Sequence, residues 1–137
     1  MSPYQYVTLR CVPRPDREEF VNVGVVLYCE DVQFLGVASR VDEGRLLAFA
    51  PALDLAHLRE SLDAAERVCT GSAHLAYEVG ARATAYGTRD LADTPSARFG
   101  LLKAPRSTVL QPGPVHGGVT TDPGLELQHL LSRLVTG

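Results

Sequence analysis

The amino-acid sequence predicts a single α+β domain covering residues 1–137, with an antiparallel β-sheet and helices packed on a face. Two observations support this class. The first 40 residues are rich in β-branched and aromatic residues, whereas two later segments have leucines at helical spacing behind a capping residue. At 137 residues, with 45% hydrophobic and 21% charged residues, the chain is long enough to bury a core and is not disordered.

The strands come first. Residues 4–12, YQYVTLRCV, alternate loosely and predict the first strand, which Pro13 and Pro15 interrupt because proline donates no hydrogen bond to a sheet. Residues 20–39 then predict a β-hairpin that turns at Glu30 and Asp31.

The first arm of that hairpin, VNVGVVLYC, has apolar side chains on both faces, which is typical of a central strand covered on both sides. Gly24 within it indicates a bulge or a close backbone approach. Simple alternation places Val23, Val25 and Leu27 on one face and Val26 and Tyr28 on the other.

Three helices follow. Residues 54–71 predict a helix with Asp54 as N-cap and Gly71 as stop, and residues 94–105 a short one with Thr94 as cap. The last helix has Asp122 as cap and Pro123 in its first turn. Its apolar stripe is Leu127, Leu130, Leu131 and Leu134. Between the helices, residues 107–111 and 114–120 predict extended segments, and HLAYEVG within the poorly patterned 73–93 a short strand.

Composition narrows the function. The net charge of -3 disfavours nucleic acid as a partner, and the chain has no apolar run of the roughly 18 residues that a membrane span needs. No secretion signal is visible, so we expect a cytoplasmic protein with reduced thiols at Cys11, Cys29 and Cys69. Neither a nucleotide-binding loop nor a metal-ligand spacing is present, so no cofactor and no metal are expected.

The first candidate site is the loop PRPDREEFVN. Here Arg14, Arg17, Glu18 and Asn22 are candidates to hold a ligand or a partner at the end of the sheet. The alternative is a solvated connection with exposed ion pairs. Asn22 lies among apolar residues and needs hydrogen-bond partners if buried, so it serves either the ligand or the attachment of the loop to the sheet.

The second candidate is residues 94–121, a 28-residue window without Asp or Glu. Arg98 and Arg106 contribute positive charge there, and Arg106 with the hydroxyls of Ser107 and Thr108 is suited to bind phosphate or carboxylate. The alternative is a proline-shaped connection in which Arg106 pairs with a distant acid such as Glu18.

His116 is the histidine outside the predicted helices and their flanks. It is either a structural, hydrogen-bonding residue or a general acid/base, and the second role needs a carboxylate and a nucleophile or water nearby.

Two long segments, YQYVTLRCVPRPDREEFVNVGVVLYC and RFGLLKAPRSTVLQPGPVHGGVTTDPGLELQHLLSRLV, resemble the bacterial family catalogued as domain of unknown function 3037. The resemblance implies a single-domain bacterial protein. It also implies a partner or accessory role beside HipA-like kinases. The family pattern matches Arg17 with Glu18, Asn22 to Val25, Arg106 to Thr108, Gln111, His116 and Asp122.

The leading hypothesis is a non-enzymatic binding or accessory module. It recognises a phosphate-bearing small molecule or the acidic face of a partner protein such as a HipA-like kinase. One alternative is a small enzyme acting on a phosphorylated or nucleotide substrate, with His116 as acid/base and Arg106 as charge stabiliser. Another is a structural homodimer, formed through a sheet edge or the leucine face of the last helix. The polar surface of the leading hypothesis comprises Arg14, Arg17, Arg98, Arg106, Ser107, Thr108 and His116.

Overall fold

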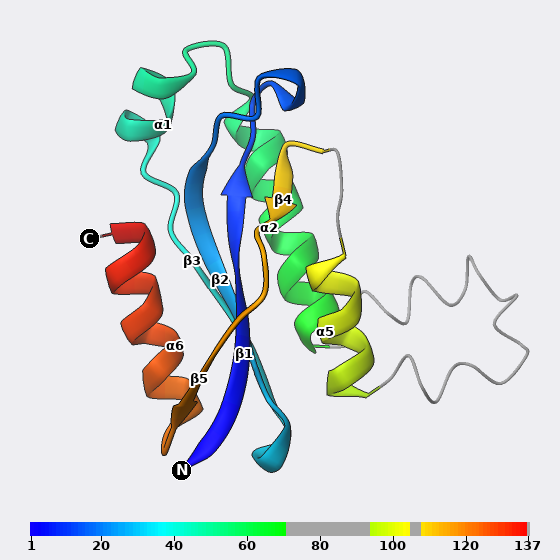
Figure 1. The fold of residues 1–137 in the computed structure, drawn as a ribbon. Helices are drawn as coiled ribbons and strands as arrows, with labels where there is room; N and C mark the ends of the chain where they lie inside the picture. Colours follow the sequence, from blue (N-terminus) through cyan, green and yellow to red (C-terminus); the bar gives the residue numbers. More distant parts are fainter. Residues whose placement is uncertain (71–93, 105–107, 137) are drawn as a thin grey trace, which may run out of the picture.

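The fold is a five-stranded antiparallel sheet with helices on both faces (Figure 1). The structure is a computed structural model that describes residues 1–70, 94–104 and 108–136. The strand order is β3-β2-β1-β4, and β5 pairs with β1 beyond the end of β4. The strands are β1 (Ser2–Cys11), β2 (Val21–Cys29), β3 (Phe34–Ser39), β4 (Leu110–Pro112) and β5 (His116–Thr120).

The helices begin at the predicted caps. Asp54 Oδ1 accepts a 3.1 Å hydrogen bond from the backbone N–H of His57, and Asp122 Oδ1 a 3.1 Å bond from that of Leu125. Thr94 caps its helix in the same way. The helices are α1 (Glu43–Phe49), α2 (Leu55–Thr70), α5 (Pro95–Lys103) and α6 (Pro123–Leu131), which continues as the π-helix η4 (Ser132–Thr136); η1 (Pro15–Arg17) and η2 (Glu30–Val32) are single 3-10 turns.

The predicted α+β fold is confirmed, and the helices cover both faces of the sheet, as expected for a strand with two apolar faces. Figure 1 shows α2 and α5 on one side of the sheet and α6 on the other. The reason is β2, whose side chains from Val23 to Cys29 are all buried and need apolar neighbours on both sides. One core cluster therefore includes Val26, Leu58 and Phe99, and the other Leu27, Leu127 and Leu130.

A β-bulge lies at Val23. The register pairs Leu9 with Gly24 and Arg10 with Asn22, so Val23 is the extra residue. Val23 consequently joins the α2 and α5 cluster, whereas Val25 joins the α6 cluster. The shared face predicted for Val23 and Val25 is therefore wrong. The bulge or close approach predicted at Gly24 is confirmed, because a Cβ there would lie 2.9 Å from the backbone oxygen of Ala38.

A cysteine of α2 contacts the outer edge of β3. Cys69 Sγ donates a 3.3 Å hydrogen bond to the backbone oxygen of Leu35. Burial raises the pKa of the Cys69 thiol. Cys69, like Cys11 and Cys29, is a free, buried thiol.

Helix α1 has no counterpart in the sequence-based prediction; Asp42 caps it by accepting from the backbone N–H of Arg45. The strand predicted within residues 73–93 lies outside the described residues. In the described part of the chain, no helix has the length and apolar character that a membrane crossing requires.

Candidate functional site

A cleft of about 550 Å³ lies at the end of the sheet where β1 runs into η1. Four segments that are far apart in sequence form it: the η1 loop, the connection between α1 and α2, the first turn of α2, and the residue before β4. Its volume lies in the range of small-molecule sites. The lining residues are Pro13, Arg14, Arg17, Glu19, Phe49, Ala50, Pro51, Ala52, Leu53, Asp54, His57 and Val109.

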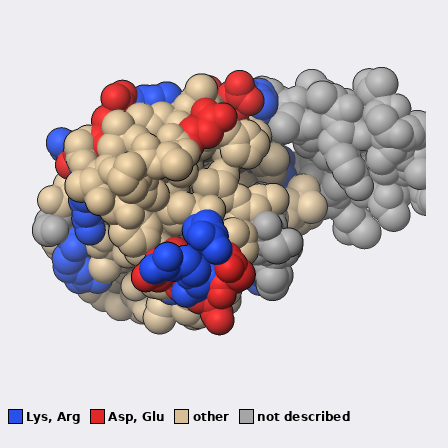
Figure 2. Space-filling model, turned by 90° about the horizontal axis from the view of Figure 1, so that it is seen from above, with Lys and Arg blue, Asp and Glu red and all other residues tan. Residues whose placement is uncertain are grey.

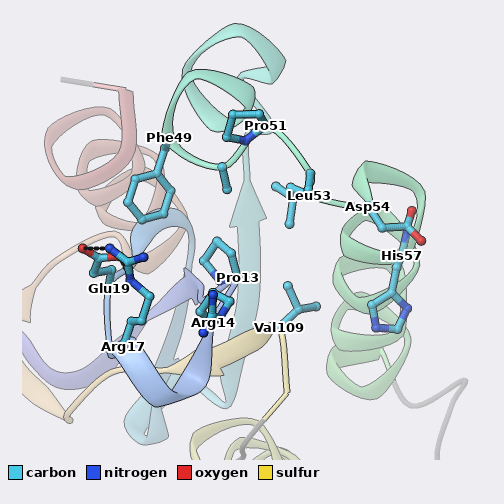
Figure 3. Close-up of a pocket in the computed structure, with 12 residues that line it drawn as sticks. Pro13, Arg14, Arg17, Glu19, Phe49, Pro51, Leu53, Asp54, His57 and Val109 are labelled. Carbon is cyan, nitrogen blue, oxygen red and sulfur yellow. Dashed lines mark hydrogen bonds and ion pairs between the residues drawn. The ribbon is translucent and has the colours of Figure 1, made fainter.

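The inner surface of this cleft is mostly apolar. Figure 3 shows Phe49, Pro51 and Leu53 on one side, with Pro13 and Val109 facing them. Phe49 is 38% exposed although its ring is large and apolar. An aromatic ring and two prolines cost little conformational entropy when a ligand covers them, so this surface is suited to an apolar group.

Two arginines stand at the rim on the η1 loop. Arg14 Nη2 lies 3.0 Å from Asp16 Oδ2, and Arg17 Nε lies 2.9 Å from Glu19 Oε1 (Figure 3 draws the second pair). The hydrogen bond from Arg14 lowers the pKa of Asp16, and that bond raises the pKa of Arg14. All four side chains are more than half exposed. Water screens such exposed ion pairs and makes them weak, so either guanidinium can leave its acid and bind an anion with which it interacts more strongly.

The first turn of α2 brings His57 and Asp54 to the opposite wall, as Figure 3 shows. Asp54 is occupied as the helix cap, so its carboxylate faces backbone N–H groups. His57 is exposed and extends from the same helical turn. Figure 2, which looks down on this end of the molecule, shows acidic and basic side chains intermingled beside a broad uncharged surface.

Of the predicted site residues, Arg14 and Arg17 line this cleft. Glu18 does not line it; it ends η1 in the left-handed conformation, with φ 56°, and is exposed. Arg106 and Ser107 lie outside the described residues. Val109 lines the cleft two residues after Ser107.

Asn22, Thr108 and Gln111 make hydrogen bonds within the protein. Asn22 Nδ2 donates a 3.2 Å bond to the backbone oxygen of Leu134, which ties β2 to the C-terminal helical turn. Thr108 Oγ1 donates to the backbone oxygen of Leu110, and Gln111 Nε2 to that of Thr108. The bonds of Thr108 and Gln111 fix the backbone at the start of β4, and the bond of Asn22 attaches η4 to β2.

Arg98 and His116 lie elsewhere. Arg98 is on α5, where its Nε donates a 3.2 Å bond to the backbone oxygen of Cys69. His116 is on β5, opposite Tyr6 of β1, and the two rings stack with centroids 5.3 Å apart. Because Tyr6 is five residues before the end of β1, His116 lies about 17 Å along the sheet from the cleft end. Neither lines the cleft.

Sequence reasoning missed His57 and Phe49. His57 has the pattern of an exposed helix residue, and it becomes part of a wall only because the first turn of α2 lies across the cleft from the η1 loop. A usable signal is FAPALD at residues 49–54, where apolar residues and a proline occupy a connection that is usually polar. Within the described ranges, no three His, Cys, Asp or Glu side chains are grouped to hold a metal ion.

Comparison with known proteins gives one match. The family described as "Protein of unknown function (DUF3037)" matches residues 6–135, so the chain belongs to this family. No curated protein and no solved structure matches the chain.

Proposed function

We propose that this member of the DUF3037 family is a non-enzymatic binding module whose cleft receives a ligand with an apolar group and an adjacent anion. The observation that supports this proposal most directly is the pairing of an apolar inner surface with two exposed arginines on one rim. Aromatic and aliphatic surfaces supply affinity, and a small number of polar groups fix the orientation.

The arginines are suited to exchange partners. Each is paired with an acid two residues away, Arg14 with Asp16 and Arg17 with Glu19. A phosphate or a carboxylate that approaches through the apolar cleft is partly desolvated, and it therefore competes well against these exposed carboxylates. Arginine also matches the planar, two-oxygen geometry of both anions.

The anion has two sources, a phosphorylated small molecule or an acidic segment of a partner protein. A HipA-like kinase is the partner that the family resemblance implies. In both cases the arginines bind a phosphate or carboxylate group, so a separate binding measurement is needed for each source.

The small-molecule arm compares inorganic phosphate with phenyl phosphate by isothermal titration calorimetry. We expect phenyl phosphate to bind at least tenfold more tightly, because its ring adds apolar contact with the cleft. The variant Arg14→Ala/Arg17→Ala should lose at least tenfold in affinity. Arg59→Ala is the matched control, since Arg59 is also exposed and paired with an acid, Glu43, outside the cleft.

The protein arm measures binding of a purified HipA-like kinase to the same variants by biolayer interferometry. Loss of kinase binding in the double variant, with binding retained in Arg59→Ala, identifies a protein as the source of the anion. The proposal fails if the folded double variant binds phenyl phosphate and the kinase as the original chain does, or if the original chain binds neither.

The enzymatic alternative with His116 receives no support from a shared site. His116 is on β5, outside the cleft, and among the described residues its side chain is stacked on Tyr6 and bonded to no carboxylate. Arg106, the other residue of that hypothesis, lies outside the described residues.

A further inference from the structure

The outer side of β5 forms an open edge of the sheet among the described residues. β5 pairs with β1 alone, and β1 is the only strand beside it in the described part of the chain (Figure 1). Natural sheets usually protect such an edge with a charged residue, a proline or a bulge inside the strand. The sequence of β5, HGGVT, contains no lysine, arginine, acid or proline.

The backbone groups that face this open edge are identified by the register. Thr8 O accepts from the N–H of Gly113, whereas Pro3 O accepts from Cys29 Sγ on β2. Even-numbered residues of β1 therefore face β4 and β5, and Tyr4 forms the bonded pair with Gly118. By alternation, the N–H and C=O groups of Gly117 and Val119 face away from β1, and no described residue bonds to them.

The side chains at this edge are unusually apolar and exposed. Val119 is 57% exposed, and Val115 and Leu125, which flank the strand, are 44% and 67% exposed. Gly117, two residues before Val119 and on the same face, presents only backbone. This surface is complementary to itself: when a second copy is rotated by 180°, its exposed valine lies over the bare backbone of the first copy's glycine, and the reverse.

We infer that β5 pairs antiparallel with β5 of a second copy of this chain, around a two-fold axis at Gly118. In this register Gly117 of one copy lies opposite Val119 of the other, and these are the two residues whose backbone groups face outward. Each pair forms two backbone hydrogen bonds. Each Val119 then covers the bare backbone of the facing Gly117, and no like charges meet in the strand.

The other edge of the sheet does not offer the same contact. Cys69 Sγ donates a hydrogen bond to the outward-facing backbone oxygen of Leu35. A strand docking on β3 would break this bond. This inference concerns a surface distinct from the cleft, so its outcome is independent of the proposed function.

Sedimentation equilibrium of the full chain tests the assembly. We expect the original chain to form dimers and Val119→Lys to weaken the dimer at least tenfold, because it places a charge at the centre of the contact. Val32→Lys is the matched control: Val32 is 56% exposed on η2, away from β5, and the charge change is the same. A monomeric original chain, or equal behaviour of the two variants, would overturn the inference.

Cross-linking tests the register and does not depend on that variant. In the proposed register, position 117 of one copy and position 119 of the other face each other with Cα atoms about 5.5 Å apart, which suits a disulfide. Position 117 and its equivalent in the other copy are diagonal neighbours about 7–8 Å apart, which is too far, and the same holds for position 119. A mixture of Gly117→Cys and Val119→Cys proteins should therefore form a disulfide dimer under mild oxidation, and neither alone. The native cysteines are buried and do not compete. Equal cross-linking in all three samples, or none in the mixture, contradicts the proposed pairing.

Discussion

The hydroxyl of Tyr4 donates a 2.8 Å hydrogen bond to Glu126 Oε2, which joins the first strand to the last helix across 122 positions of sequence. Tyr4 is 9% exposed. Burial, followed by the hydrogen bond to Glu126, raises the pKa of Tyr4 to about 12. The contact therefore links the attachment of α6 to the protonation of one phenol.

This link predicts a loss of stability in alkali. The folded-state pKa of Tyr4 is above its ordinary value of 10.0, so its contribution is complete below pH 10 and is lost as the pH rises towards 12. We expect the free energy of unfolding to fall by an amount on the order of 2 kcal/mol over this interval, measured by urea denaturation. The fall should be smaller in Tyr4→Phe. Tyr6→Phe is the control, and an identical fall in Tyr4→Phe would refute the assignment.

Two glycines should respond in opposite directions to alanine. At Gly24 a Cβ would lie 2.9 Å from the backbone oxygen of Ala38, so Gly24→Ala should destabilise the fold by about 1–3 kcal/mol. At Gly100, in α5, nothing lies within 4 Å of a new Cβ, and Gly100→Ala should stabilise by about 0.5–1 kcal/mol. Thermal unfolding of both variants measures the two effects. A stabilising Gly24→Ala would contradict the close approach at the bulge.

Asn22 should hold the C-terminal turn. Asn22→Ala leaves the backbone oxygen of Leu134 without its 3.2 Å donor, which costs about 1–3 kcal/mol when such a group stays buried. We expect faster amide exchange in residues 132–136, measured by hydrogen–deuterium exchange with mass spectrometry. Gln111→Ala is the control because its bond reaches only to Thr108. Unchanged exchange in 132–136 would show that other contacts hold the turn.

The thiol of Cys69 should protect the β3 edge. Cys69→Ala removes the hydrogen bond to the backbone oxygen of Leu35 and leaves that oxygen open. We expect larger assemblies, detected by light scattering at raised concentration. Cys11→Ala is the matched control, since Cys11 is also a buried free thiol. If both variants scatter alike, the effect comes from lost packing alone.

Local signals in the sequence predicted most of the fold. The helix starts at Asp54, Thr94 and Asp122 are confirmed because a cap and its helix lie within a few residues of one another. The face of Val23 was not predictable in this way. It depends on the register between two strands, and one extra residue reverses the side to which a residue points.

The candidate site was predictable in part. Arg14 and Arg17 stand out because charges follow prolines in a short loop, and both line the cleft. Phe49 joins them through the folding of α1, which has no strong pattern of its own, and His57 through the position of the first turn of α2. A polar surface that joins Arg14 to His116 cannot be assessed from the sequence, because the pairing of β5 with β1 places His116 at a distance from the cleft along the sheet.

The bond of Cys69 to β3 also bears on how far the inferred assembly could grow. A sheet that can add copies at both edges gives a fibre of unlimited length. Because the thiol occupies the outward-facing backbone oxygen of Leu35, a copy that joined at β3 would have to displace it. In the inferred pairing, by contrast, the two β5 strands satisfy each other's outward-facing backbone groups, so the expected product is a closed pair and not a fibre.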